Sequence, residues 1–60
     1  MTDIVVGDRV QYITDIEWGP PKGLVGVVTH VYSDGTLLVR PIGELSQYLA
    51  KRREIRPIPD

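Results

Sequence analysis

The chain has 60 residues, no cysteine and one histidine; 42% of its residues are hydrophobic and its net charge is −1 at pH 7. A chain this short forms one small domain that buries only about 60% of the surface its unfolded form exposes. The lack of cysteine excludes disulfide scaffolds, cysteine-ligated zinc and thiol nucleophiles, and a single histidine excludes a His-rich metal site. We therefore expect one domain over residues 1–60, with no metal and no other cofactor.

The N-terminus shows no targeting signal. Met1-Thr2-Asp3 is not the charged start of a signal peptide, and no apolar run approaches the roughly 18 residues of a membrane span. We expect a cytoplasmic protein without membrane contact.

Glycine and proline divide the first part of the chain into short segments rich in β-branched residues, as in small all-β domains. The first predicted strand is Arg9–Ile13, in which Val10 and Tyr12 share one face. Residues 14–23 contain two glycines and two consecutive prolines, which predicts an extended loop. Ten residues is long for a loop in so small a domain, and such loops often carry function.

The second predicted strand, Leu24–Tyr32, is the most strongly β-prone segment. Gly26 within it indicates a bulge, a bend or a close approach of two backbones. If the strand bends there, the expected core residues are Val25, Val28 and Val31.

A hairpin and a last strand complete the expected elements. The Asp-Gly pair within Ser33–Thr36 predicts a tight turn into a strand at Leu37–Arg40, closed by Pro41. Residues 44–54 lack glycine and proline, and the spacing of Leu45, Tyr48 and Leu49 at i, i+3 and i+4 allows about two helical turns with one apolar face. A short strand, Glu54–Arg56, is expected to follow. These segments make four or five short strands, and the expected fold is a small five-stranded all-β barrel with a short helical turn before the last strand.

This order of elements resembles that of SH3-like barrels. Gly7-Asp8-Arg9-Val10 is typical of their first strand, and Lys22-Gly23-Leu24-Val25-Gly26-Val27-Val28 resembles the KOW motif of ribosomal proteins and transcription elongation factors. The resemblance implies an SH3-like barrel over nearly the whole chain. Because this architecture hosts unrelated functions, it implies no single activity.

A second resemblance is to the plasmid-encoded, trimethoprim-resistant dihydrofolate reductase, a small SH3-like barrel that forms one active site per tetramer. The shared features are Gly7-Asp8-Arg9-Val10 and the tryptophan in the following loop, Trp18. Where that enzyme has a catalytic Val-Gln-Ile-Tyr stretch, this chain has Ser46-Gln47-Tyr48-Leu49, which departs from the pattern. The resemblance implies an enzyme that acts only when assembled.

Trp18 is the only tryptophan, and it has two interpretations. It either anchors an interface, where tryptophan contributes much of the binding energy, or folds over the end of the barrel and closes the core.

The basic residues gather near the C-terminus. Residues 37–60 carry five basic and three acidic side chains, net +2, whereas residues 1–36 carry two basic and five acidic ones, net −3. The cluster Lys51, Arg52, Arg53 and Arg56 is suited to phosphates, to an acidic protein surface or to the acidic half of another copy. The alternative is a solvated helix end, where cations suit the helix dipole.

The three tyrosines and His30 have both structural and functional interpretations. Tyr32 could form a stacking platform with Trp18, and Tyr48 could contact a partner. Otherwise Tyr12 is core, Tyr32 and Tyr48 are half-buried, and His30 lies on the surface of its strand.

No carboxylate pair, activated nucleophile or phosphate-binding loop is present in the sequence. We therefore expect a non-catalytic binding module or accessory subunit that docks onto a protein or nucleoprotein complex. Its expected partner-binding residues are Trp18, Tyr32, Tyr48, Lys51, Arg52, Arg53 and Arg56. The alternatives are weak direct binding of nucleic acid through the basic segment, and an assembly-dependent enzyme; a homo-oligomer is compatible with each.

Overall fold

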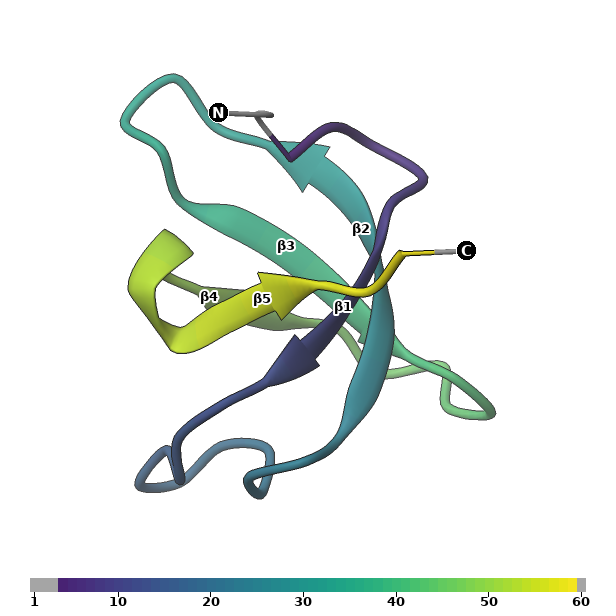
Figure 1. Ribbon diagram of the computed structural model, residues 1–60, viewed down its shortest axis with the longest axis vertical. Coiled ribbons are helices and arrows are strands. Elements are labelled where there is room, and N and C mark those ends of the chain that lie inside the picture. The colour runs from purple at the N-terminus through teal and green to yellow at the C-terminus, as the bar shows by residue number, and fades with distance from the viewer. Residues whose placement is uncertain (1–3, 60) are drawn as a thin grey trace.

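Five antiparallel strands curl into a half-barrel in the computed structural model, which describes residues 4–59 (Figure 1). The elements are β1 (Arg9–Tyr12), β2 (Val25–Val31), β3 (Leu37–Pro41), β4 (Tyr48–Ala50), the 3-10 turn η1 (Arg52–Glu54) and β5 (Ile55–Pro57). The strand order is β4-β3-β2-β1-β5, and η1 connects the two edge strands. The predicted all-β fold, with five strands and a short helical turn before the last, is confirmed. The expectation about Met1-Thr2-Asp3 lies outside the described residues.

The core lies on the inner face of the curled sheet. Val10 and Tyr12 of β1 are both buried, which confirms the predicted alternation, because successive side chains of a strand point to opposite faces. They pack with residues from every other strand and from the N-terminal segment: Ile4, Val28, Leu37, Val39, Ala50 and Ile55. Pro57 is tolerated in β5 because an edge strand needs few ladder bonds.

β2 is irregular at Thr29 and not at Gly26. The register with β3 shifts between Val28 and His30, which leaves Thr29 as the extra residue of a bulge. Gly26 instead marks a close approach, since a Cβ atom there would lie 2.6 Å from Val39 Cγ1 and 2.9 Å from the Arg40 carbonyl oxygen. The inner face of β2 before the bulge is therefore formed by Gly26 and Val28.

The predicted core of β2 is correct for one residue of three. Val28 is buried, but Val25 is half-buried and Val31 is 38% exposed. A bend at Gly26 would have turned Val25 inward. Because the chain keeps its register there, Val25 lies on the outer face, and Val31 lies beyond the bulge at the end of the strand.

The β2–β3 hairpin has the predicted turn. Gly35 has a φ of 92°, a left-handed conformation that glycine adopts without steric cost. Asp34 Oδ1 accepts a hydrogen bond of 2.9 Å from the Thr36 backbone N–H, and the Thr36 carbonyl accepts one of 2.8 Å from Tyr32 N–H. The Asp-Gly pair therefore fixes the turn through its own local bonds.

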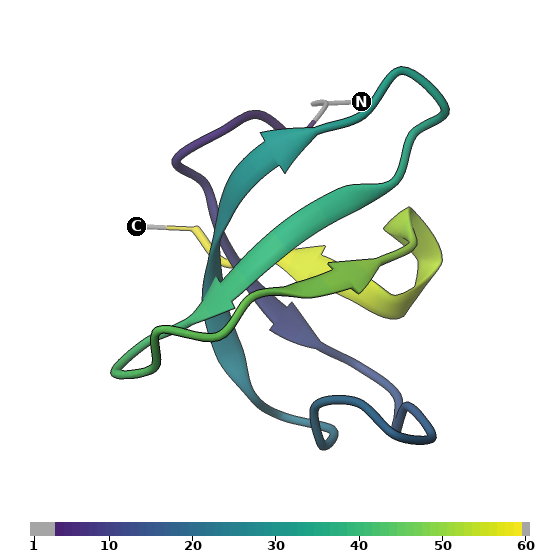
Figure 2. The same cartoon turned by 180° about the vertical axis from the view of Figure 1, so that it is seen from behind.

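The two-turn helix predicted within residues 44–54 is wrong. Tyr48–Ala50 forms β4 beside β3, where Figure 2 shows the two strands from behind, and only Arg52–Glu54 is helical. Leu45 and Leu49, which were to form the apolar face of the helix, are 93% and 61% exposed. A helix of two turns is marginal in water, whereas pairing with β3 satisfies the backbone and buries Ala50.

Candidate docking surfaces

The β1–β2 connection, residues 13–24, is called the Trp18 loop below. Ile16 packs partly buried against the core, and Pro20 is buried. Between these two inward-facing residues, Gly19 N–H donates a 3.0 Å hydrogen bond to the Ile16 carbonyl. A Cβ atom on Gly19 would lie 2.8 Å from Ile16 Cγ2, so the close turn requires glycine. Ile16 and Pro20 therefore anchor the loop, one on each side of Trp18 in the sequence.

Further bonds hold the remainder of this loop. The backbone N–H of Lys22 donates to Asp15 Oδ1 at 2.9 Å, which bridges the two sides of the loop. At its base, the Gly23 N–H donates to the Tyr12 carbonyl at 2.8 Å and the Tyr12 N–H donates to the Leu24 carbonyl at 2.9 Å. The loop is therefore fixed along its length by the chain's own polar groups.

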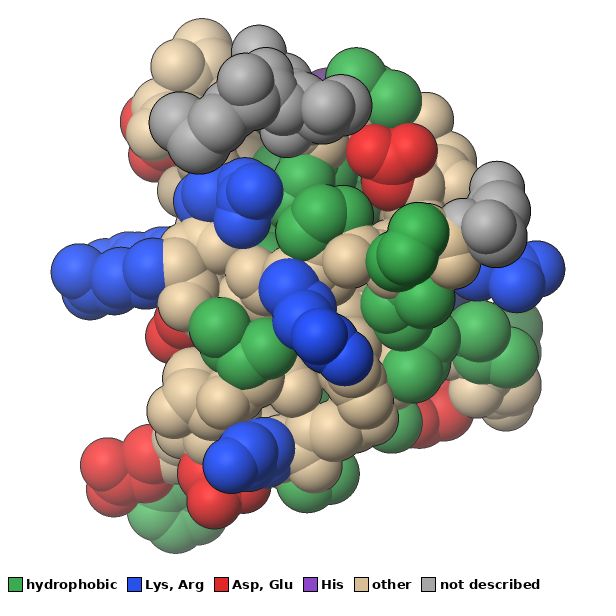
Figure 3. Space-filling model, in the orientation of Figure 1, with side chains coloured by type: hydrophobic (Ala, Val, Ile, Leu, Met, Phe, Trp, Pro, Cys, Tyr) green, Lys and Arg blue, Asp and Glu red, His purple; other side chains and the backbone are tan. Residues whose placement is uncertain are grey.

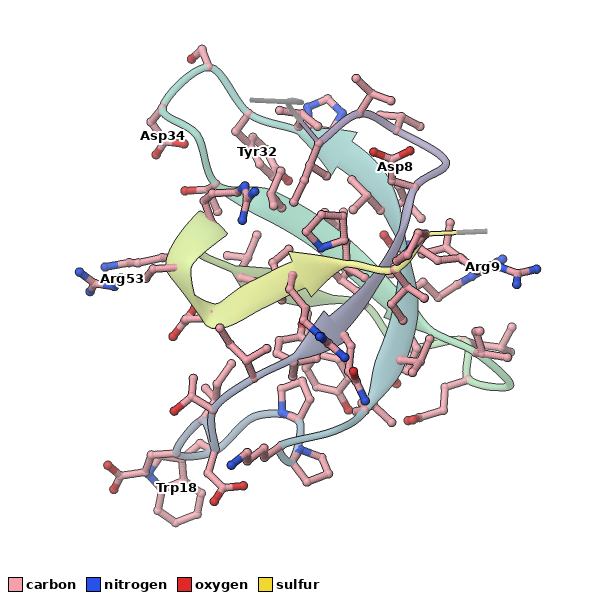
Figure 4. All side chains as sticks on the ribbon, viewed as in Figure 1. Asp8, Arg9, Trp18, Tyr32, Asp34 and Arg53 are labelled. Carbon is pink, nitrogen blue, oxygen red and sulfur yellow. The ribbon has the colours of Figure 1, made fainter. Side chains whose placement is uncertain are left out.

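Trp18 projects from the end of this loop into solvent. It is 96% exposed, and Figure 4 shows its ring pointing away from the barrel. Its φ is +62°, and Trp18 is the one non-glycine among residues 4–59 with a positive φ. The interpretation of Trp18 as the residue that closes the core is therefore wrong, and from this loop Ile16 and Leu24 pack against the core instead.

The basic cluster lies on η1 and β5 instead of on a helix end. Arg52 Nη1 donates to the Ile55 carbonyl at 3.4 Å, and Arg56 donates through Nε and Nη2 to Gln11 Oε1 at 3.3 and 3.1 Å. Lys51 and Arg53 are exposed, and Arg53 points outward from the barrel (Figure 4). On the face of the molecule that Figure 3 shows, Lys and Arg side chains lie along the left edge and across the middle.

Three cations share a shallow depression with the β2–β3 turn. It has a volume of about 420 Å³ and is lined by Asp34, Gly35, Thr36, Lys51, Arg52 and Arg53. Arg56 lies in a different depression, of about 260 Å³, beside Gln11 and Lys22 at the base of the Trp18 loop. The predicted cluster of four cations is thus divided between two places.

The tyrosines do not gather with Trp18. Figure 4 shows Tyr32 and Trp18 at opposite ends of the molecule, so the predicted stacking platform does not form. Tyr32 is 40% exposed and meets the exposed ring of His30 edge-on, with the ring centroids 4.5 Å apart. Tyr48 is half-buried opposite Val39. The expectation that these two tyrosines are half-buried packing residues holds for Tyr48, whereas Tyr32 is slightly more exposed.

Tyr12 is the buried polar group at the base of the Trp18 loop. Its side chain is 1% exposed and its hydroxyl has no hydrogen-bond partner. Burial, followed by the charges of Glu54 and Tyr48, raises the pKa of Tyr12 from 10.0 to about 12. The phenol is therefore neutral at physiological pH and serves as an apolar core residue.

Sequence reasoning missed two residues that adjoin the basic cluster. Leu49 and Thr36 line a depression of about 240 Å³ together with Lys51. Leu49 was assigned to the apolar face of a helix, and Thr36 to a turn. The signal that relates them is the pairing of β4 with β3, in which Leu38 opposes Leu49, and this pairing is not visible in one sequence.

Comparisons of the chain with models of protein families, with curated proteins and with solved structures find no match. Within residues 4–59, no helix is long and apolar enough to cross a membrane. In the same part of the chain, no three histidine, cysteine or acidic side chains come close enough together to hold a metal ion.

Proposed function

We propose that this protein is a non-catalytic docking module that binds a protein or nucleoprotein complex in the cytoplasm. The Trp18 loop supplies an apolar anchor, and the segment from Lys51 to Arg56 supplies charge complementarity. The resemblance to KOW-containing and other SH3-like barrels agrees with such an accessory role.

The observation that carries the proposal is the combination of exposure and constraint at Trp18. A tryptophan that is 96% exposed contributes almost nothing to its own core. A positive φ is unfavourable for a bulky residue, at a cost of about 1–3 kcal/mol. Strained residues persist where the surrounding structure fixes them, and they cluster at functional sites. An exposed, strained and well-anchored tryptophan is best explained by a partner that receives its ring.

The rigidity of the loop supports the same interpretation. Binding is weakened by the entropy lost when side chains and loops become ordered at an interface. The Trp18 loop is already ordered by its inward anchors, Ile16 and Pro20, and by the bond between Lys22 and Asp15. Tryptophan is also among the residue types most enriched at the energetic centre of interfaces.

The position of the cations fits a partner that contacts one side of the molecule. In Figure 4, Arg53 projects from the left side of the barrel, and Trp18 projects from the lower left end. A partner that receives the Trp18 ring can therefore extend along this side toward η1. Exposed charges of this kind contribute to association rate and specificity more than to affinity.

Quantitative capture from extracts of the source cell tests the proposal. The wild-type protein and the variants Trp18→Ala and Leu45→Ala are used as baits. Leu45 is the matched control because it is 93% exposed in another loop. We expect Trp18→Ala to fold normally and to lose at least about tenfold of the captured partner, as for a hot-spot residue. Leu45→Ala should capture as much as the wild type. Equal capture by both variants would contradict a docking role for Trp18.

Direct binding to nucleic-acid phosphates is the second candidate function. It is favoured by the convergence of Lys51, Arg52 and Arg53 on one depression. Neutralised phosphates release counterions, so this binding would weaken steeply with added salt. Titration of labelled protein with oligo(dT) and oligo(U) at low salt tests it, and the absence of any chemical-shift change near η1 would exclude it.

A further inference from the structure

Three shallow depressions meet at Thr36 and form one continuous surface. The first brings the β2–β3 turn beside η1, the second brings Leu49 beside Lys51, and the third, of about 290 Å³, brings Tyr32 beside Leu49. Thr36 lines all three. The Thr36 surface is defined here by the residues that line these depressions: Tyr32, Asp34, Gly35, Thr36, Leu49, Ala50, Lys51, Arg52, Arg53 and Glu54.

Strand register brings these residues together from distant parts of the sequence. Leu37 at the start of β3 opposes Ala50 at the end of β4. The residue before Leu37 and the residue after Ala50 are Thr36 and Lys51, so the hairpin turn and the basic turn meet at this end of the sheet. The surface is thus built on paired strands and two tight turns, which keep its shape without a ligand.

One side of the Thr36 surface is apolar and the other is cationic. Leu49 is 61% exposed and Tyr32 is 40% exposed on the apolar side. Lys51, Arg52 and Arg53 lie on the cationic side, where the three positive charges exceed the one negative charge of Glu54, whose carboxylate accepts a hydrogen bond of 2.8 Å from the Lys51 backbone N–H. A ligand that suits both sides places a large apolar side chain over Leu49 and negative charges beside η1. An apolar contact of this kind is favourable because it removes apolar surface from water.

Two kinds of negatively charged chain could meet these cations, an acidic peptide and a nucleic acid, and Asp34 distinguishes between them. Its carboxylate lines the same depression as the three cations. The hydrogen bond from the Thr36 backbone N–H lowers the pKa of Asp34, so this carboxylate remains charged. A peptide has an uncharged backbone whose N–H groups can donate to such a carboxylate, whereas a nucleic acid carries a negative phosphate at every nucleotide, which the carboxylate repels. Asp34 therefore favours a peptide and repels a continuous chain of phosphates.

We propose that the Thr36 surface binds an acidic peptide segment that carries one large apolar side chain. The apolar side chain lies on Leu49 and Tyr32, the flanking carboxylates face the cations of η1, and a backbone N–H faces Asp34. This inference rests on the proposed docking function and names the chemistry of one segment of the partner.

The test uses synthetic peptides and the ¹⁵N-labelled 60-residue chain. The probe is a short capped peptide with one central leucine, in which aspartates alternate with uncharged glycines on either side of the leucine. We expect its addition to shift the backbone amides of Thr36, Leu49 and Arg53, with a smaller effect as salt is raised. Replacing the central leucine by alanine should weaken binding about tenfold, since most of the apolar contact is lost. A peptide with lysine at every acidic position should not bind.

Paired variants locate the site. Arg53→Glu replaces an attraction by a repulsion and should weaken peptide binding about tenfold. Arg9→Glu makes the same charge change on the opposite side of the molecule, where Figure 4 shows Arg9, and should weaken binding by no more than about twofold. Leu49→Ala should weaken binding about as much as Arg53→Glu, whereas Leu45→Ala should leave it unchanged. Both leucines are largely exposed, so neither variant is expected to unfold the protein.

Three outcomes would overturn the inference. The first is shifts that map away from the Thr36 surface, and the second is an equal loss of binding in Arg53→Glu and Arg9→Glu. The third is tighter binding of oligo(U) than of the peptide at these same amides, which would assign the surface to nucleic acid. Each leaves the docking function open to its own test, because loss of capture in Trp18→Ala does not depend on the peptide.

Discussion

Two loops of this molecule each present a large apolar side chain to solvent, and they differ in how they hold it. The Trp18 loop fixes its tryptophan between Ile16 and Pro20, which face inward. The β3–β4 connection, residues 42–47, presents Leu45 at 93% exposure, and all six of its residues are exposed. Leu45 is nearly as exposed as Trp18, at 96%.

The backbone conformations of the two loops also differ. Trp18 has a positive φ, whereas Leu45 does not. A bond between Asp15 and the backbone of Lys22 joins the two sides of the Trp18 loop. In the β3–β4 connection, the N–H groups of Ile42 and Glu44 bond to residues of β2 and β3, and Gln47 accepts from Thr29. Exposure alone does not mark a binding residue, since single exposed apolar residues are common. Exposure together with an unfavourable, firmly held backbone separates Trp18 from Leu45.

The largest expected effect concerns the base of the Trp18 loop. Burial raises the pKa of Tyr12 to about 12, above its value of 10.0 in the unfolded chain. The neutral phenol therefore contributes stability that is fully present below pH 10 and is lost as the pH rises from 10 to about 12. A rise of this size corresponds to about 2–3 kcal/mol in the free energy of unfolding. Urea unfolding at a series of alkaline pH values measures the loss.

Tyr12→Phe is the control for this titration. The Tyr12 hydroxyl has no hydrogen-bond partner, so phenylalanine should fit without loss of stability at neutral pH. The variant should lose much less stability between pH 10 and pH 12 than the wild type. In the wild type, the fluorescence anisotropy of Trp18 should fall over the same range, because the backbone of Tyr12 holds the base of the loop. An equal alkaline loss in Tyr12→Phe would show that another group is responsible.

Local chemistry explains which parts of this fold could be predicted from the sequence. The turn at Asp34 and Gly35 depends on a carboxylate bond and a left-handed glycine within the same few residues. The alternation of Val10 and Tyr12 depends only on the geometry of one strand. Both were predicted correctly because no distant residue changes them.

The elements that were predicted wrongly depend on distant partners. Tyr48–Ala50 is a strand because β3 lies beside it, although its own apolar spacing suits a helix. The bulge lies at Thr29, whose hydroxyl donates to Gln47 Oε1 at 2.8 Å, whereas Gly26 marks the close backbone approach that was one of the three predictions for it. These features depend on which distant segments pair and pack with one another, and a single sequence does not reveal those partners.

For the candidate site, the sequence was enough to identify most of the residues, but it did not predict how they are arranged in space. Trp18 and the cations were identified from their chemistry, since tryptophan and clustered charges are rare in so short a chain. Their division between a loop, a hairpin turn and a 3-10 turn follows from strand register. The contribution of Leu49 follows from the same register.

A smaller effect on stability is expected when one isoleucine of each loop is replaced by alanine. Ile16→Ala removes a partly buried side chain that packs on the core, and should destabilise the protein by about 1–2 kcal/mol. Ile42→Ala removes a side chain that is 60% exposed, and should cost less than about 0.5 kcal/mol. Thermal or urea unfolding measures both. Similar values for the two variants would show that the Trp18 loop is not anchored more firmly than the β3–β4 connection.

The smallest effects are expected when Trp18 or Leu45 is replaced by glycine. The two substitutions should change the free energy of unfolding in opposite directions. Glycine adopts a positive φ without steric cost, so Trp18→Gly should remove the strain at this position. After allowance for the greater freedom of glycine in the unfolded chain, we expect a gain of about 0.5–1 kcal/mol in the free energy of unfolding. Leu45→Gly relieves no such strain and should lose about 0.5 kcal/mol.

The same Trp18→Gly variant should lose partner capture while it gains stability. A residue kept for packing cannot give this result, because its removal would lower the free energy of unfolding. A residue that is strained in order to present its side chain does give it, since function is retained at a cost in stability. Unfolding curves and capture assays on the same two glycine variants therefore decide whether Trp18, unlike Leu45, is held in a strained conformation that serves binding. If Trp18→Gly is destabilised as much as Leu45→Gly, the backbone at Trp18 is not strained, and its exposure has no more meaning than that of Leu45.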